Sequence, residues 1–193
     1  MDAQFGAIEG VIRTRVGYAG GQTEHPDYGN IGDHTEAVQV DFDPEKISYA
    51  TLLAVFWDSH RPDGRSWKRQ YLNAVFYHDA RQEQEALASR AALEDRLGRS
   101  VRTEVLPLRS FTRAEDYHQK YILKRESDLM RELSRMYPNH KDLVDSTTVA
   151  RLNGYIGGHG SPEQFRREFE GLGLSPEGRK KVENIVRGKG PFN

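Results

Sequence analysis

The sequence predicts an α+β fold, in which a mostly antiparallel sheet is covered on one face by helices and is followed by a C-terminal helical appendage. Three features favour this fold. Runs with a two-residue hydrophobic period alternate with runs of helical period along residues 1–137. A glycine-rich loop separates the first two strand-like runs, and residues 138–193 carry helical start and stop signals. We therefore expect a domain at 1–137 and an appendage at 138–193 packed on it.

The composition narrows the possible partners and sites. The chain has 193 residues, of which 36% are hydrophobic, enough for one well-cored domain with an appendage. A formal net charge of −1 gives no electrostatic reason to expect nucleic acid or an anionic membrane as partner. We find neither a signal peptide nor an apolar run near the roughly 20 residues of a membrane span, and we expect a monomeric cytoplasmic protein.

Cysteine and histidine usage bears on cofactors. The chain has no cysteine, which excludes disulfides, thiolate metal sites and thiol nucleophiles from these residues. None of the seven histidines forms an H-x-x-x-H pair, and carboxylates with ligand spacing are missing nearby. We therefore expect no metal and no bound cofactor.

The first elements surround a long loop. Residues 1–10 have the pattern of a short helix, with Gly10 as its expected C-cap. Strands are expected near residues 11–16 and 38–42, where apolar residues alternate. Between them, Arg15–Phe42 contains six glycines and prolines that prevent regular structure, and loops of this length are usually functional or mobile.

The next elements alternate between helix and strand. Ser48 is expected to cap a helix that ends near His60, and the alternation over Tyr71–Tyr77 predicts a strand. Asp79 followed by Gln82 resembles a capping box for a helix stopped by a glycine at 98, and residues 101–105 form a further short strand.

The remaining chain is expected to be helical. Ser110 is the expected cap of a helical segment within residues 110–125, and another helix runs toward residue 136. In the appendage, Ser161-Pro162 and Ser175-Pro176 have the cap-then-proline arrangement of helix starts.

The residues alone give a modest indication of a site. Tyr28, Glu36 and Tyr71 come from a loop and from two strand starts that can share one end of a sheet. The alternative is that these residues form no site, because a glutamate that opens a strand is usually solvated and tyrosines usually pack their rings. Trp67 either covers a pocket or simply packs. Both interpretations stay open at this level.

Five ordered blocks, spread over roughly residues 5–123, resemble the A-type peptide methionine sulfoxide reductase family. The blocks are RVGYAGG at 15–21, PDYGNIGDHTEAVQVDFDP at 26–44, SYATLLAVFWDSH at 48–60, RQYLNAVFYH at 69–78 and AEDYHQKY at 114–121. This resemblance implies a two-layer, ferredoxin-like βαββαβ sandwich and an oxidoreductase that reduces the S epimer of methionine sulfoxide, free or in proteins, to methionine.

The resemblance also implies roles for individual residues. The family uses a nucleophilic cysteine in a GCFWG motif at the start of a helix, and thioredoxin or another thiol regenerates the enzyme. By motif, Glu36, Tyr28 and Tyr71 would donate a proton to the sulfoxide oxygen, and Tyr28, Tyr71 and Trp67 would contact the substrate. A glutamate acts as an acid when its pKa is raised, so we expect Glu36 to be buried near rings.

The sequence departs from the family pattern in three ways. The GCFWG motif and every possible replacement cysteine are missing. An interior strand that precedes the motif is also missing, which predicts unpaired strand edges. Ser66 replaces the usual acidic residue before the tyrosine, and Leu72-Asn73 replace the usual Arg-Ser. Substrate orientation is therefore expected to differ from that of typical members.

Two hypotheses follow for the missing nucleophile. The chain is expected to be a truncated reductase whose start codon is misplaced, because residues 1–5 match the helix that follows GCFWG. A UGA codon read as selenocysteine would explain such an error in gene prediction. The alternative is a pseudoenzyme that binds methionine sulfoxide without turnover. A third class, in which residues 142–193 act as a helical interaction module, is weaker.

Overall fold

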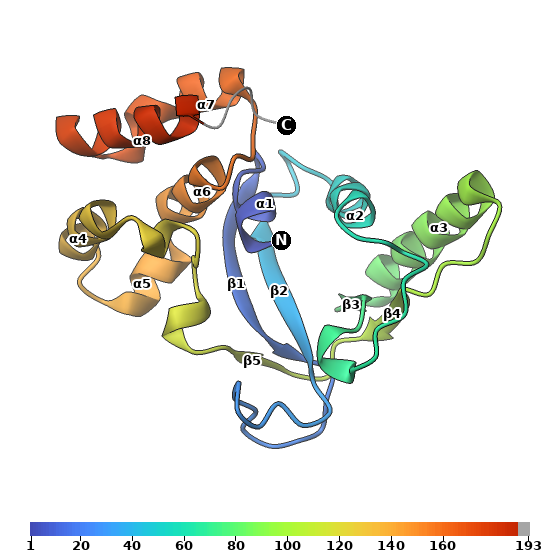
Figure 1. The fold of residues 1–193 in the computed structure, drawn as a ribbon. Coiled ribbons are helices and arrows are strands. Elements are labelled where there is room, and N and C mark those ends of the chain that lie inside the picture. Colours follow the sequence, from blue (N-terminus) through green and yellow to red (C-terminus); the bar gives the residue numbers. More distant parts are fainter. Residues whose placement is uncertain (189–193) are drawn as a thin grey trace. The chain divides into compact units, whose positions relative to one another are not determined.

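The computed structural model describes residues 1–188, which divide into two compact units. Unit 1 contains Met1–Arg15, Val38–Lys46 and the chain from Asp116 onward. Unit 2 contains Val16–Ala37 and Ile47–Glu115. The expected domain boundary between residues 137 and 138 stays a prediction. The order of elements is shown in Figure 1.

Unit 2 contains a βαβ arrangement covered by helix α2. Strand β3 (Ala74–Tyr77) pairs in parallel with β4 (Glu104–Pro107), and α3 (Ala80–Leu97) connects them. Parallel neighbours need such a crossover, which explains this departure from the mostly antiparallel expectation. Helix α2 (Tyr49–Asp58) packs against α3. The core between these elements includes the following buried residues: Leu53, Trp57, Ala86, Leu93 and Val101.

The predicted caps of α2 and α3 are present. The Ser48 side chain accepts a hydrogen bond from the Thr51 amide, and Asp79 accepts one from the Gln82 amide. Gly98 ends α3 in a left-handed conformation with φ of 63°. Side-chain acceptors at a helix start satisfy amides that lack intrahelical partners, so short polar residues determine these boundaries.

A second sheet has the strand order β2-β1-β5. Strand β1 (Val11–Ala19) and strand β2 (Thr35–Phe42) each continue from one unit into the other. Strand β5 (Phe111–Arg113) pairs antiparallel with the end of β1, so that Gly17 lies opposite Arg113 and Ala19 opposite Phe111.

The five described strands therefore fall into two sheets, with β2 at one edge of the larger sheet and β3 at one edge of the smaller. The expectation that a missing interior strand leaves strand edges unpaired stays a prediction. The mixed architecture with C-terminal helices agrees with the predicted fold class.

Unit 1 packs a short N-terminal helix against the C-terminal helices. Its α-helices are α1 (Asp2–Gly6), α4 (Ser127–Met136), α5 (His140–Asp145), α6 (Thr147–Ile156), α7 (Pro162–Glu168) and α8 (Pro176–Gly188). Helices α1 and α6 lie side by side (Figure 1). The apolar core of this unit includes the fully buried Leu133, Val149 and Val182. The predicted cap at Ser161 is present, since its side chain accepts from the Gln164 amide.

A buried polar cluster joins the start of α1 to β1. The Lys120 side chain has no exposed surface, and its Nζ donates to Thr14 O at 2.6 Å and lies 3.3 Å from Asp2 Oδ1. Burial lowers the pKa of Lys120 from its ordinary value of 10.5, while the Asp2 carboxylate opposes this shift. Such a cation is stable inside a protein only when its donors are paired.

Three expected elements are wrong in detail. The segment 110–125 is not a helix but β5 followed by the short 3₁₀ turns η2 (Asp116–His118) and η3 (Leu123–Arg125), because pairing with β1 overrides local helical signals. Helix α1 ends at Gly6, and Gly10 instead takes a φ of 91° just before β1. Tyr71 precedes β3 and lies in the 3₁₀ turn η1 (Arg69–Tyr71).

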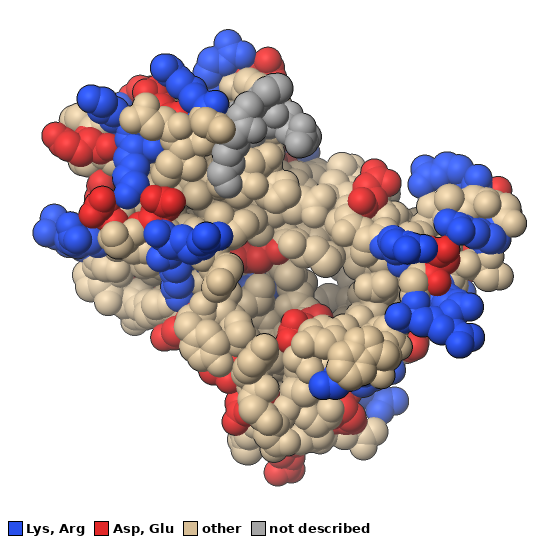
Figure 2. All heavy atoms as spheres, viewed as in Figure 1, with Lys and Arg blue, Asp and Glu red and all other residues tan. Residues whose placement is uncertain are grey.

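The surface carries charges of both signs. In Figure 2, lysines and arginines are interspersed with aspartates and glutamates on the visible face of each unit. Among residues 1–188, no helix is long and apolar enough to cross a membrane.

Candidate active site

All four candidate site residues belong to unit 2. Tyr28 lies on the loop between β1 and β2, and Glu36 is the second residue of β2. Tyr71 is the last residue of η1, and Trp67 lies just before that turn. The loop, the strand and the turn are the elements that position the site.

Asp33 closes the β1–β2 loop on itself. Its carboxylate accepts hydrogen bonds from the Gln22 amide at 2.9 Å, the Thr23 amide at 3.0 Å and the Thr23 hydroxyl at 2.8 Å. Bonds from Thr23, first its amide and then its hydroxyl, hold the pKa of Asp33 well below its ordinary value of 3.8. The loop therefore has a fixed base although its surface is exposed.

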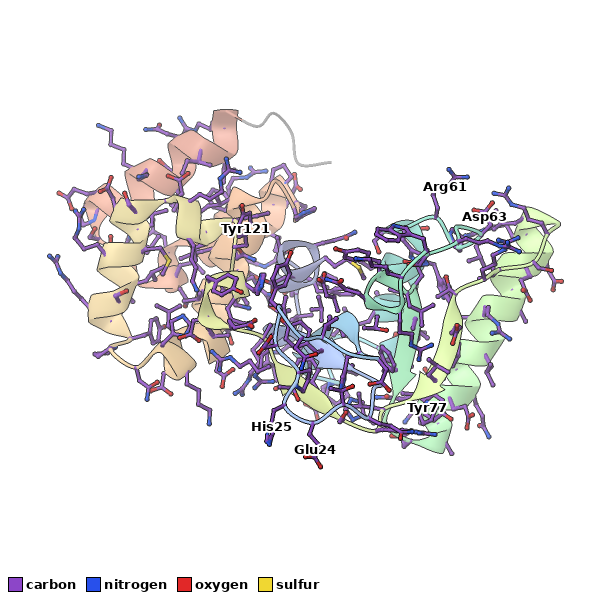
Figure 3. The ribbon with its side chains drawn as sticks, turned by 60° about the horizontal axis from the view of Figure 1, so that its bottom comes forward. Glu24, His25, Arg61, Asp63, Tyr77 and Tyr121 are labelled. Carbon is purple, nitrogen blue, oxygen red and sulfur yellow. The ribbon has the colours of Figure 1, made fainter. Side chains whose placement is uncertain are left out.

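His34 fixes the same loop from inside. It is 1% exposed, and its Nδ1 accepts from the Gly21 amide at 3.2 Å while Nε2 lies 2.9 Å from Thr23 O. An accepting Nδ1 carries no proton, so Nε2 is the nitrogen that donates to the carbonyl. This histidine has a structural role. By contrast, Glu24 and His25 project from the loop into open space (Figure 3).

Glu115 positions Tyr28, a role that the sequence did not reveal. Its Oε1 accepts from the Tyr28 amide at 2.8 Å, and its Oε2 accepts from the hydroxyl of the buried Tyr18 at 2.7 Å. The bond from the Ala114 amide to Val16 O brings this part of the chain beside β1. Glu115 falls within the resembling block AEDYHQKY, but nothing local indicates a partner 87 residues away.

The start of β2, at Thr35 and Glu36, is connected to η1 by two hydrogen bonds. Its Oε1 accepts from Gln70 Nε2 at 2.7 Å, and the neighbouring Thr35 hydroxyl donates to Arg69 O at 3.0 Å. Glu36 is exposed, so the expected burial near rings is wrong for these residues. Its side chain meets the polar Gln70 amide at the start of β2 rather than an aromatic ring.

The aromatic side chains beside this turn are exposed. Trp67 is 79% exposed and Tyr71 47% exposed, and their ring centroids are 6.3 Å apart. Lys68 Nζ lies 4.6 Å from the centroid of the Trp67 ring, within cation–π range. Trp67 is thus no core residue, which removes the simple packing interpretation.

Direct contacts therefore bring Glu36 to the turn that carries Tyr71, and Trp67 to Tyr71. Tyr28 is 51% exposed, and its backbone is held by a different residue, Glu115. Together these groups offer a carboxyl group, phenol hydroxyls and an indole face at the surface of one unit. Such groups can bind a polar oxygen next to an apolar methyl group.

A cavity of about 330 Å³ has Arg69 in its wall and is lined by none of the four candidates. Its lining residues are Gly20, Gln22, Asp33, Arg69, Phe76, Leu106, Pro107 and Arg109. Both arginines are exposed, the Asp33 carboxylate already accepts hydrogen bonds from Gln22 and Thr23, and the lining contains no phenol group. We therefore place the candidate site at the Glu36 surface. Within residues 1–188, no cluster of three or more His, Asp or Glu side chains could hold a metal ion.

Comparison with protein families gives two matches. The family model described as peptide methionine sulfoxide reductase matches residues 1–152. The model described as selenoprotein methionine sulfoxide reductase A, helical domain, matches residues 138–187. These matches cover the candidate site and the C-terminal helices, and they confirm the resemblance drawn from the five sequence blocks.

Individual proteins agree with the family matches. A peptide methionine sulfoxide reductase of Drosophila melanogaster is 41% identical over 181 residues, covering 93% of this chain and 72% of that protein. Peptide methionine sulfoxide reductase MsrA of Methanococcoides burtonii is 40% identical over 136 residues, or 64% of this chain and 88% of that protein. The crystal structure of reduced Mxr1 from Saccharomyces cerevisiae has a TM-score of 0.55 at 25% identity, over 58% of this chain and 71% of that chain.

Proposed function

Since this chain belongs to the peptide methionine sulfoxide reductase family, we propose that its unit 2 binds methionine S-sulfoxide, free or in proteins, for reduction to methionine. The observation that supports this most strongly is the link from Glu36 through Gln70 to the turn that carries Tyr71. Relatives that carry the reductase name match this chain at about 40% identity.

The proposed roles follow from the charge that develops during reduction. When a nucleophile attacks the sulfoxide sulfur, negative charge moves onto the oxygen, which then needs a hydrogen-bond donor or a proton. The hydroxyls of Tyr28 and Tyr71 would donate hydrogen bonds to this oxygen, and the Glu36 carboxyl group would supply a proton as the S–O bond breaks. The exposed ring of Trp67 would contact the apolar part of the substrate, as would the tyrosine rings.

The proposed reaction needs a nucleophile that residues 1–193 do not contain, since the chain has no cysteine. A thiolate or selenolate would form a bond to the sulfoxide sulfur, and the S–O bond would break as the oxygen takes protons. The protonated oxygen leaves as water, a water molecule then attacks the sulfur or selenium of the nucleophile, and the bond from that atom to the methionine sulfur breaks. Methionine leaves with two electrons from the nucleophile, which ends as a sulfenic or selenenic acid. An external thiol, such as thioredoxin, would then reduce that acid and release water.

We propose that this nucleophile is encoded before the Met1 codon as cysteine or selenocysteine. The family model that matches residues 138–187 is described for a selenoprotein, which favours a search for both codons. The nucleotide sequence tests this directly. The proposal is supported if the upstream reading frame encodes a strand-like segment followed by Gly-X-Phe-Trp-Gly, where X is a cysteine codon or UGA. If the frame encodes no such motif, the binding-only alternative is favoured.

Binding tests the proposal on the 193-residue chain itself. A peptide containing methionine S-sulfoxide should bind with measurable heat in titration calorimetry, and the R epimer and unoxidised methionine should bind more weakly. Glu36→Ala removes the carboxyl group without supplying another donor and should weaken binding about threefold to tenfold, the value of one hydrogen bond. With dithiothreitol alone, this chain should give no methionine.

Glu24→Ala is the matched control, because Glu24 is an exposed carboxylate on the neighbouring loop that projects into solvent (Figure 3). It should bind like the unmodified chain. Equal affinity for both epimers, or equal loss in Glu24→Ala and Glu36→Ala, would contradict the assignment of this site.

A further inference from the structure

Helix α1 is too short to be stable alone, yet both of its ends are bonded to the C-terminal helices. It has five residues, far fewer than the roughly 12–15 that an isolated helix needs. At its end, Gly6 O accepts from Arg151 Nη1 at 2.6 Å, and Ala7 O accepts from Gln164 Nε2 at 2.7 Å. Carbonyls at a helix end lack intrahelical partners, so these donors supply bonds that the helix cannot make itself.

The start of α1 is held by the same region. Asp2 Oδ2 accepts from Asn153 Nδ2 at 3.1 Å, while Asp2 Oδ1 accepts from the Thr14 hydroxyl at 2.5 Å. Asn153 is 1% exposed, and its Oδ1 also accepts from the Leu123 amide at 3.0 Å. Both functional atoms of this buried amide are therefore used, which fixes its orientation.

Helices α1 and α6 also approach so closely that only glycine fits between them. A Cβ on Gly154 would lie 2.6 Å from Ala7 Cβ and 2.7 Å from Ala3 O. A Cβ on Gly6 would lie 2.6 Å from Ala150 O. Backbone atoms cannot move away as a flexible side chain can, so any added methyl group must separate the helices.

Glu168 on α7 organises the donors that reach the end of α1. Its Oε2 accepts from Arg151 Nε at 3.0 Å and from the Tyr155 hydroxyl at 2.5 Å, and its Oε1 accepts from Gln164 Nε2 at 3.2 Å. Arg151 is 5% exposed, so this carboxylate compensates a charge that would otherwise be buried alone.

We propose that α6 and α7 form a clamp that fixes the position of α1, with Arg151, Gln164 and Asn153 as its positioning residues. The clamp gives the C-terminal helices a role within this chain, rather than in binding a separate partner. One step rests on the proposed function: in this family the nucleophile stands at the start of a helix. A clamp on α1 would therefore hold the helix that follows the nucleophile in a fixed position within unit 1.

Amide hydrogen exchange tests the clamp without any catalytic activity. The Phe5 amide donates to Met1 O and the Ala7 amide to Ala3 O, so both report whether α1 is formed. In the unmodified chain they should exchange far more slowly than in an unstructured peptide. Gln164→Glu keeps the side-chain shape but removes the donor, and should speed exchange at both amides about tenfold. Gly154→Ala should do the same by separating the helices.

Two controls separate the clamp from a general loss of stability. Arg166→Gln alters an exposed residue on α7 that pairs with Glu163, and Gly171→Ala adds a methyl group with nothing within 4 Å. Both should leave exchange at Phe5 and Ala7 unchanged. Arg151→Lys should retain part of the protection that Arg151→Met loses, because a lysine can still donate to Gly6 O.

Rapid exchange of α1 in the unmodified chain would overturn the clamp. Unchanged protection in Gln164→Glu would also overturn the clamp. This variant alters a half-buried side chain, so it still tests the clamp if the variants at more buried positions unfold. These outcomes are independent of the proposed function. Failure to bind methionine S-sulfoxide would remove that function but leave the exchange result, and therefore the clamp, standing.

Discussion

The polar side chains of the clamp region in unit 1 differ in burial from the candidate site residues in unit 2. Unit 1 buries Lys120, Arg151 and Asn153 and supplies each with defined hydrogen-bond partners. Unit 2 leaves Glu36 exposed and keeps Trp67 and Tyr71 on its surface. Buried polar groups that are fully paired fix geometry, whereas exposed groups remain available to a ligand. This difference is what we expect if the clamp region positions α1 and the exposed surface around Glu36 binds a ligand.

The difference also shows which residues should affect stability and which should affect binding. Substitutions in the buried clusters of unit 1 should lower the free energy of unfolding. Substitutions at the exposed candidate site should leave it unchanged and act on sulfoxide affinity alone. The substitutions below test this division, beginning with the largest expected effect.

Lys120→Met should cause the largest loss of stability. The lysine ammonium is fully buried against Asp2 and Thr14, and its removal would leave the Asp2 carboxylate without its cation. Breaking a buried pair in this way costs about 3–5 kcal/mol of unfolding free energy. Urea denaturation followed by circular dichroism measures the loss. Lys180→Met, at an exposed position, should change it by no more than about 0.5 kcal/mol.

Glu115→Gln should lower both the stability and the sulfoxide affinity, because Glu115 accepts hydrogen bonds from the buried Tyr18 and the loop residue Tyr28. Hydrogen bonds to a charged group contribute about 1.5–3 kcal/mol, so we expect a stability loss in that range. Sulfoxide affinity should also fall, because a neutral glutamine oxygen holds the Tyr28 amide less strongly than the carboxylate does. Tyr18→Phe removes the hydrogen bond from the tyrosine hydroxyl and leaves the bond to the Tyr28 amide, so it should lower stability with little loss of affinity.

The Asp33 loop should show a distinctive dependence on pH. Hydrogen bonds lower the pKa of Asp33, so its stabilising effect is present above the unfolded-state value of 3.8 and is lost as pH falls through the lower folded-state pKa. The amide signals of Gln22 and Thr23 in NMR spectra should therefore keep their positions down to pH 3.8 and move only below it. In Asp33→Asn the loop signals should already be altered at neutral pH. A transition near pH 3.8 in the unmodified chain would show that these bonds are not formed.

Glu36→Gln should have the smallest effect on stability. Glu36 is exposed and its one described contact is the hydrogen bond from Gln70, so the free energy of unfolding should change by no more than about 0.5 kcal/mol. Thermal unfolding monitored by circular dichroism measures this. A loss above about 2 kcal/mol would place Glu36 among the structural groups and end the division between the two units.

The sequence was most informative where local chemistry determines structure. The caps at Ser48, Asp79 and Ser161 were predicted correctly, because a side-chain acceptor and the amide it bonds lie three residues apart. The segment 110–125 was predicted incorrectly, since its first residues pair with β1 nearly a hundred positions away. There the Ser110 hydroxyl donates to Gly21 O at 3.4 Å and caps no helix.

At the candidate site, too, the sequence predicted local features but not contacts between distant segments. Glu36 and Tyr71 were identified by their motifs, and two hydrogen bonds do connect the start of β2 with the segment 69–71. The alternation of Tyr71–Tyr77 predicted a strand that begins too early, because Leu72 and Asn73 continue the alternating pattern but lie outside β3. The exposure of Glu36 and the role of Glu115 depend on contacts between distant segments, which periodicity does not encode.

A two-dimensional NMR titration of the isotope-labelled 193-residue chain with a methionine S-sulfoxide peptide tests the central claim most directly. We predict saturable shifts of the Tyr28, Glu36 and Tyr71 amides and of the Trp67 indole, with smaller shifts for the R epimer and none for methionine. Shifts confined to unit 1, or equal shifts for both epimers and for methionine, would contradict the claim that the exposed surface around Glu36 binds methionine S-sulfoxide.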